Sequence, residues 1–106
     1  MKLITKEIED MIAKHPIHSH DGEGENALVI VKFFYPWGAG TWLATEGEKQ
    51  EDGDYLFFGY CEIGYEWEAG YFSLNELKKI TKFGRPAVER EKFDGGRKKT
   101  VKILMR

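Results

Sequence analysis

Aromatic residues are concentrated in the middle of this 106-residue chain, and they constrain its fold more than any other feature. Thirteen of the fifteen lie between Phe33 and Phe72. Such residues bury large areas and favour strands, so the block predicts a sheet that carries the core. Thirteen are nevertheless many for one side of a small sheet. Tyr35, Trp37 and Tyr60 are therefore candidates for exposure.

Four runs of apolar, β-branched and aromatic residues divide this part of the chain, and each is bounded by residues typical of turns. The predicted strands are residues 27–35, 41–45, 55–63 and 65–72. Between the second and the third, residues 46–54 are expected to form an acidic loop exposed to solvent. Gly64 marks a tight turn before the fourth.

Helices are expected on both sides of these strands. Ile8 and Ile12 follow a potential N-cap, Thr5, at helical spacing, and Pro16 ends this first helix. Residues 73–76, Ser-Leu-Asn-Glu, form a capping box that begins a second helix, which reaches about residue 81.

A chain of this length forms one domain by the usual size of domains. The pattern predicts an α+β fold in which residues 1–106 form a single globular domain. A curved, mainly antiparallel sheet of four to six strands is joined by two short helices. Residues 88–93 and 100–105 are expected as short strands, and residues 97–106 as a basic tail or a terminal edge strand.

Charge is sorted by position along the chain. Residues 1–77 hold 5 basic and 15 acidic side chains, which gives 5 − 15 = −10. Residues 78–106 hold 11 basic and 3 acidic side chains, which gives 11 − 3 = +8. Such asymmetry is a sequence-level indication of charged partners.

Several short motifs together resemble the bacterial family catalogued as domain of unknown function 2958. They are Lys32-Phe33-Phe34 with Pro36, Thr41-Trp42, residues 54–60 (Asp-Tyr-Leu-Phe-Phe-Gly-Tyr), residues 70–74 (Gly-Tyr-Phe-Ser-Leu), and Glu89-Arg90-Glu91 with Phe93. The resemblance covers roughly residues 1–93. It implies a small protein of a plasmid, phage or conjugative element, and it offers no catalytic residues. The histidine-rich loop and the basic tail depart from the family pattern.

Several classes of function are disfavoured. No apolar run approaches the roughly 20 residues of a membrane helix, and the N-terminus lacks the apolar core of a signal peptide. The single cysteine, Cys61, suits a reducing compartment, so a cytoplasmic protein is expected. No nucleophile motif, phosphate loop or CxxC pair occurs, so we expect neither an enzyme nor a cofactor.

Three histidines lie close together, at His15, His18 and His20. Their spacing suits metal ligands, but structural zinc sites usually draw four ligands from separated positions. We therefore expect a solvated loop and no metal site, with these three residues as weak candidates.

A partner-binding face is expected among acidic and aromatic residues of the strands. Carboxylates spaced along a sheet can imitate a phosphate backbone and occupy the basic groove of a nucleic-acid-binding protein. The candidates are Trp37, Tyr60, Glu62, Glu66 and Glu68.

The basic segment offers a second kind of site. Arg97, Lys98, Lys99 and Lys102 are candidates for binding phosphates with little sequence preference. Two structural alternatives remain open, namely lysines that protect an edge strand from aggregation and charges that neutralise the acidic face.

The leading hypothesis is a small non-enzymatic accessory protein of a mobile element. It binds a protein partner and inhibits a host-defence or nucleic-acid-handling protein. The alternative is a nucleic-acid-binding accessory protein that uses the basic C-terminal segment and exposed aromatics.

Overall fold

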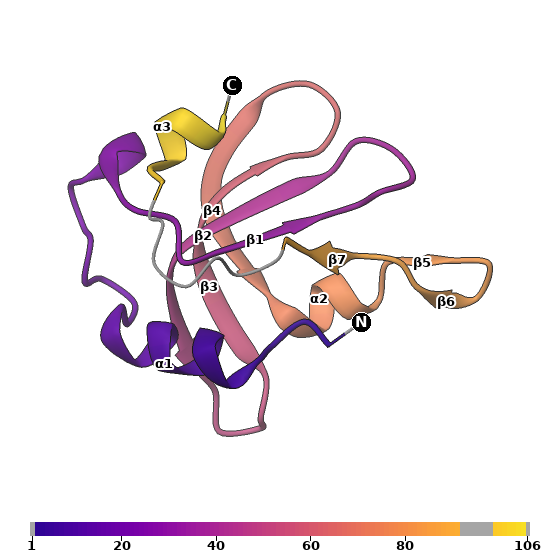
Figure 1. The fold of residues 1–106 in the computed structure, drawn as a ribbon, viewed down its shortest axis with the longest axis horizontal. Helices are drawn as coiled ribbons and strands as arrows, with labels where there is room; N and C mark the ends of the chain where they lie inside the picture. The colour runs from indigo at the N-terminus through magenta and orange to yellow at the C-terminus, as the bar shows by residue number, and fades with distance from the viewer. Residues whose placement is uncertain (1, 92–98, 106) are drawn as a thin grey trace.

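The structure is a computed structural model that describes residues 2–91 and 99–105 (Figure 1). An antiparallel sheet of five strands has the order β4-β3-β2-β1-β7, and consecutive strands along the chain pair in β1–β2, β2–β3 and β3–β4. The expected α+β fold is confirmed. The strands are β1 (Val31–Phe34), β2 (Thr41–Lys49), β3 (Tyr55–Glu62), β4 (Trp67–Ser73) and β7 (Glu89–Arg90).

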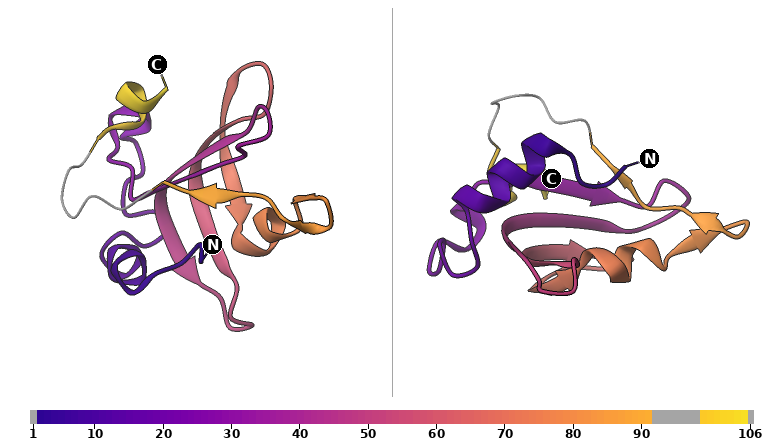
Figure 2. Two further views of the ribbon diagram at one scale, coloured as in Figure 1. Left: turned by 45° about the vertical axis from the view of Figure 1, so that its right-hand side comes forward. Right: turned by 90° about the horizontal axis from the view of Figure 1, so that it is seen from below.

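Three α-helices, one 3₁₀ helix and a small hairpin complete the described part of the chain. The sheet is curved, and the hairpin projects away from it (Figure 2). These elements are α1 (Lys6–Lys14), the 3₁₀ helix η1 (Gly24–Asn26), α2 (Leu74–Lys78), the hairpin strands β5 (Thr81–Lys82) and β6 (Arg85–Pro86), and α3 (Val101–Leu104). Among these helices none is long and apolar enough to cross a membrane.

The main core lies between one face of the sheet and the helices α1 and α2. Phe33 and Phe57 are fully buried there, with ring centroids 5.6 Å apart. Ile8 from α1 and Leu77 from α2 cover them. Gly59 is required in this layer, because a Cβ at this position would collide with the Leu43 carbonyl oxygen. The sheet therefore carries the core, as the sequence predicts, and the aromatic block supplies five of its buried residues, Phe33, Trp42, Tyr55, Phe57 and Phe72.

Both expected N-caps are confirmed. The Thr5 hydroxyl accepts the Ile8 backbone N–H at 3.3 Å, and the Ser73 hydroxyl accepts the Glu76 N–H at 3.1 Å. Each bond satisfies an N–H that the first helical turn leaves without a partner. The helix α2 ends at Lys78, and the β5–β6 hairpin occupies the region where its last turn was expected.

The C-terminal segment is helical, so the prediction of a strand over residues 100–105 is wrong. Only an isolated bridge between Leu28 and Thr100 remains of it. The Thr100 hydroxyl then accepts the Ile103 N–H at 3.4 Å and caps α3. Val101 alone on this helix is fully buried, and its N–H donates to the Ala27 carbonyl at 3.0 Å. The alternating apolar residues Val101, Ile103 and Met105 favour a strand in the sequence, but in the structure only Val101 is buried as an anchor.

The largest differences between predicted and observed strand boundaries lie in the first two strands. The first strand begins only at Val31, because the preceding backbone bonds the C-terminal segment, as in the Val29 N–H bond to the Lys99 carbonyl at 2.9 Å. The second strand continues to Lys49 and includes residues 46–49 of the expected acidic loop. A bulge between Ala44 and Glu46 makes this continuation possible, and it determines the environment of Glu46.

Candidate functional site

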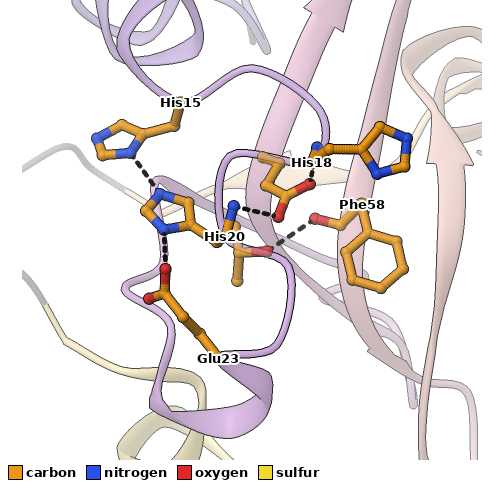
Figure 3. Close-up of polar contacts among 7 residues, drawn as sticks. His15, His18, His20, Glu23 and Phe58 are labelled. Carbon is orange, nitrogen blue, oxygen red and sulfur yellow. Dashed lines mark hydrogen bonds and ion pairs between the residues drawn. The ribbon is translucent and has the colours of Figure 1, made fainter.

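Glu46 is a buried carboxylate that organises the loop after α1. Its side chain is 2% exposed, although the sequence assigned it to a solvated loop. The two carboxylate oxygens accept the backbone N–H groups of His18 at 2.7 Å and His20 at 2.9 Å (Figure 3). Charge-assisted bonds of this kind are about twice as strong as neutral ones. The loop is thereby fixed against the edge of β2, where the Gly47 N–H also donates to the His15 carbonyl at 3.0 Å.

The bulge in β2 places this carboxylate. Ala44 pairs with Gly59 and Glu46 with Phe58, so Thr45 is the additional residue on β2. Its hydroxyl donates to the Phe58 carbonyl at 3.2 Å. Bulges often redirect a side chain at a functional or structural site. Here the redirected side chain holds a loop from the preceding part of the chain.

The three candidate metal ligands are engaged with other protein groups. His15 Nδ1 and His20 Nε2 lie 2.7 Å apart, and the two rings stack with centroids 4.9 Å apart. His20 Nδ1 contacts a Glu23 carboxylate oxygen at 2.6 Å (Figure 3). His18 lies apart from this pair, and its Nδ1 contacts an Asp21 carboxylate oxygen at 3.1 Å. Within residues 2–91 and 99–105 no group of three or more His, Cys, Asp or Glu side chains is arranged to hold a metal ion. The loop is a hydrogen-bonded chain from Glu23 through His20 to His15.

The predicted partner-binding residues do not form one continuous surface. Glu68 pairs with Cys61 and Tyr60 pairs with Ala69, so Glu68 and Tyr60 point to opposite faces of the sheet. Glu66 is exposed in the β3–β4 turn, and Glu62 is half-buried at the end of β3. Tyr35 and Tyr60 are half-buried, whereas the expected exposure of Trp37 is confirmed.

Exposed apolar side chains that the sequence analysis missed lie around β4. Tyr65 in the β3–β4 turn is 98% exposed, and Ile63 beside it is 63% exposed. Tyr71 on β4 is 54% exposed and makes an edge contact with the Phe58 ring, with centroids 5.0 Å apart. Tyr71 lies on the same face of β4 as Trp67, four residues earlier, and no other element covers this face at Tyr71 among the described residues. The exposure of Tyr71 is understood only once the structure shows that β4 is an edge strand.

The two edges of the sheet differ in how they are protected. The strand β7 has two residues, Glu89 and Arg90, both charged. The strand β4 has seven residues, includes no lysine or proline, and pairs among the described segments only with β3. Short length and charges are the usual means by which proteins protect edges. The edge of β4 is therefore the one open to pairing.

Cys61 is half-buried beside this edge. Burial raises the pKa of its thiol, and the negative charge of Glu68, its cross-strand neighbour, raises the pKa further. The thiol is therefore held in its unreactive protonated form. The interpretation of Cys61 as a structural residue agrees with this environment.

A cleft of about 790 Å³ opens between the N-terminal segment, α2 and the region of β7. One wall contains Tyr55, whose hydroxyl donates to the Glu9 carboxylate at 3.0 Å. Burial and this bond to Glu9 raise the pKa of Tyr55. The lining combines apolar side chains with both basic and acidic ones, so the cleft favours neither an anionic nor a cationic ligand. The lining includes Lys2, Leu3, Glu9, Tyr55, Leu74, Leu77, Lys78, Val88 and Glu89.

The basic candidates divide between described and undescribed residues. Lys99 and Lys102 are exposed at the start of α3 and on it. Arg97 and Lys98 lie outside the described residues. The described part of the chain therefore supplies two exposed basic side chains in this region.

Comparison with known proteins identifies the family of the chain. Neither the curated proteins nor the solved structures yield a significant match. A family model described as "Protein of unknown function (DUF2958)" matches residues 3–102. The match includes the histidine-rich loop and residues 97–102 of the basic tail, so the expectation that the tail lies beyond the family pattern is wrong for these residues. The chain belongs to this family of proteins of unknown function, DUF2958.

Proposed function

We propose that the protein is a non-enzymatic binding protein that takes an extended segment of a protein partner along β4. The observation that carries this proposal is a seven-residue edge strand without protecting lysine or proline, flanked by exposed tyrosines. An added strand would gain main-chain hydrogen bonds from the open edge.

The side chains around this edge suit a protein partner. Tyr65 and Tyr71 offer large, rigid apolar surfaces with a polar end, and tyrosine is enriched among residues that dominate binding energy. Glu66 is exposed beside Tyr65 in the turn, and Glu68 is exposed on the face of β4 opposite Tyr71. Both carboxylates would favour a partner segment along this edge that carries basic side chains. The revised partner residues therefore line the β4 edge from both sides of the sheet, and they are Tyr65, Glu66, Glu68 and Tyr71.

Three more specific parts of the proposal rest on the sequence. They are a mobile-element setting, a cytoplasmic location, and inhibition of a host-defence or nucleic-acid-handling protein. The acidic side chains at the edge support the last of these, because a basic groove is the surface they would complement.

Capture from a host lysate with matched variants tests the proposal. Ala69→Lys adds an edge lysine at an exposed position, and Tyr71→Ser removes an exposed ring, so both are expected to abolish capture of a specific partner. Ile103→Ser removes a side chain of similar exposure (52%) on α3 and is expected to leave capture intact. Identical sets of captured proteins for all four chains would refute the proposal.

Self-association is the competing outcome at an open edge. Sedimentation of the parent chain and Ala69→Lys at increasing concentration distinguishes it. A dimer that forms in the parent chain and is lost in Ala69→Lys would mean that a second copy, and not a different protein, occupies β4.

A further inference from the structure

Two exposed aromatic side chains from separate turns meet at the β5–β6 hairpin. Trp37, between β1 and β2, is 60% exposed, and Phe83, at the tip of the hairpin, is 84% exposed. Their ring centroids lie 5.9 Å apart and the rings are nearly perpendicular, at 88°. The Lys82 ammonium lies 5.6 Å from the Trp37 centroid and 5.2 Å from the Phe83 centroid.

Phe83 occupies a backbone conformation that suits a phenylalanine poorly. It has φ of +54°, and Gly84 after it has φ of +74°. These two residues connect paired Lys82 and Arg85, so they form a two-residue turn of the kind that favours Asn-Gly. A bulky residue with positive φ is strained. Because the ring is exposed, burial does not offset this strain, and such strain is often found at functional positions.

The hairpin segment that carries Phe83 is basic. Residues 78–86 contain four basic side chains, at Lys78, Lys79, Lys82 and Arg85, and no acidic one. None of the four forms an ion pair with any residue of the described ranges. Lys78 lies in the lining of the cleft with Glu9 and Glu89, whereas Lys82 lies over the two rings and pairs along the hairpin with Arg85. Lys82 and Arg85 are therefore the cations that anionic groups of a ligand would meet.

We infer that Trp37, Phe83 and the basic residues around them form a binding site for single-stranded nucleic acid. Planar bases stack on exposed aromatic rings, and phosphates are neutralised by lysine and arginine. A base that stacks on Trp37 or Phe83 displaces the Lys82 ammonium toward a phosphate. An acidic peptide would satisfy the cations but offer no bases to the rings, and a duplex keeps its bases stacked on each other.

This site is separate from the partner face at β4 and does not use the C-terminal basic residues. Trp37 was expected in the acidic partner face, but it belongs to this site because its ring contacts Phe83 and Lys82. The two surfaces can therefore be tested independently.

Phe83→Asn is the decisive variant, because asparagine suits a positive φ and removes the ring. Binding of fluorescent oligo(dT) and oligo(U) to the full chain is measured by anisotropy at low salt. We expect Phe83→Asn to weaken binding about 5- to 150-fold, the change that corresponds to the loss of one stacked base. The control Ile63→Asn, at an exposed apolar side chain elsewhere, is expected to bind like the parent chain.

Salt dependence tests the cations. At about 0.7 per phosphate contact, contacts from Lys82 and Arg85 give a slope of log K against log salt of about −1.4, and Arg85→Gln is expected to flatten it by about 0.7. Any of four results would overturn the inference. They are no binding at low salt, equal binding of a duplex or of oligoglutamate, unchanged binding in Phe83→Asn, or binding that only a variant of Arg97, Lys98 and Lys99 removes.

Discussion

Replacing Glu46 with glutamine tests how the histidine-rich loop is held. The substitution keeps the shape of the side chain and one acceptor oxygen, but it replaces the other oxygen with an NH₂ group. Both carboxylate oxygens accept backbone N–H groups, from His18 at 2.7 Å and His20 at 2.9 Å. In Glu46→Gln one of these donors faces another donor, and the remaining bond loses its charge.

The expected loss follows from the two bonds. A hydrogen bond to a charged group contributes about 1.5–3 kcal/mol, so the pair contributes about 3–6 kcal/mol. Glutamine retains one neutral bond and removes the cost of burying a charge, which offsets part of this. We expect the free energy of unfolding to fall by about 2–4 kcal/mol. At about 4 °C per kcal/mol for a domain of this size, the Tm falls by about 8–16 °C.

Urea unfolding gives the free energy, and hydrogen exchange at the His18 and His20 amides shows whether the loss is local. Glu48→Gln is the matched control, because it makes the same charge change at an exposed position two residues along β2, and we expect it to shift stability by less than about 0.5 kcal/mol. If Glu46→Gln also stays within about 0.5 kcal/mol of the parent chain, with both amides equally protected, the anchoring role of Glu46 is refuted.

Three further predictions concern single side chains. Phe83→Asn relieves the positive-φ strain at φ +54° and is expected to raise the free energy of unfolding by about 0.5–1 kcal/mol in urea, whereas a loss of stability would argue against strain. The pKa of Tyr55 is raised in the folded state, so its protonated hydroxyl stabilises the fold fully below the ordinary pKa of about 10, and this contribution is lost as pH rises through the folded-state pKa. The free energy of unfolding of Tyr55→Phe should therefore depend less on pH above about 10 than that of the parent chain. Cys61 is expected to react with iodoacetamide at pH 8 more slowly than a free thiol, and Glu68→Gln should speed the reaction; a rate equal to that of free cysteine contradicts the raised pKa.

Features that depend on nearby residues were predictable from the sequence. The caps at Thr5 and Ser73 act on N–H groups three residues away, so their residue types alone reveal them. The aromatic block predicted the core for a similar reason, because strand preference and burial both follow from residue type. The α+β class and the antiparallel sheet followed from these signals.

Features that depend on distant contacts were not predictable. The burial of Glu46 requires a bulge in β2 and a loop from the start of the chain, and neither has a local signal. The alternation that indicated a C-terminal strand is overridden by the Thr100 cap and by the burial of Val101. The contact between Trp37 and Phe83 joins two turns that are far apart in the sequence.

Hydrogen exchange on the complex with a captured partner tests the central proposal most directly. If a partner segment adds to the sheet at β4, amides within residues 67–73 gain protection of tenfold or more, while those of β7 and α3 do not change. Protection gained at other elements with β4 unchanged would contradict the proposal.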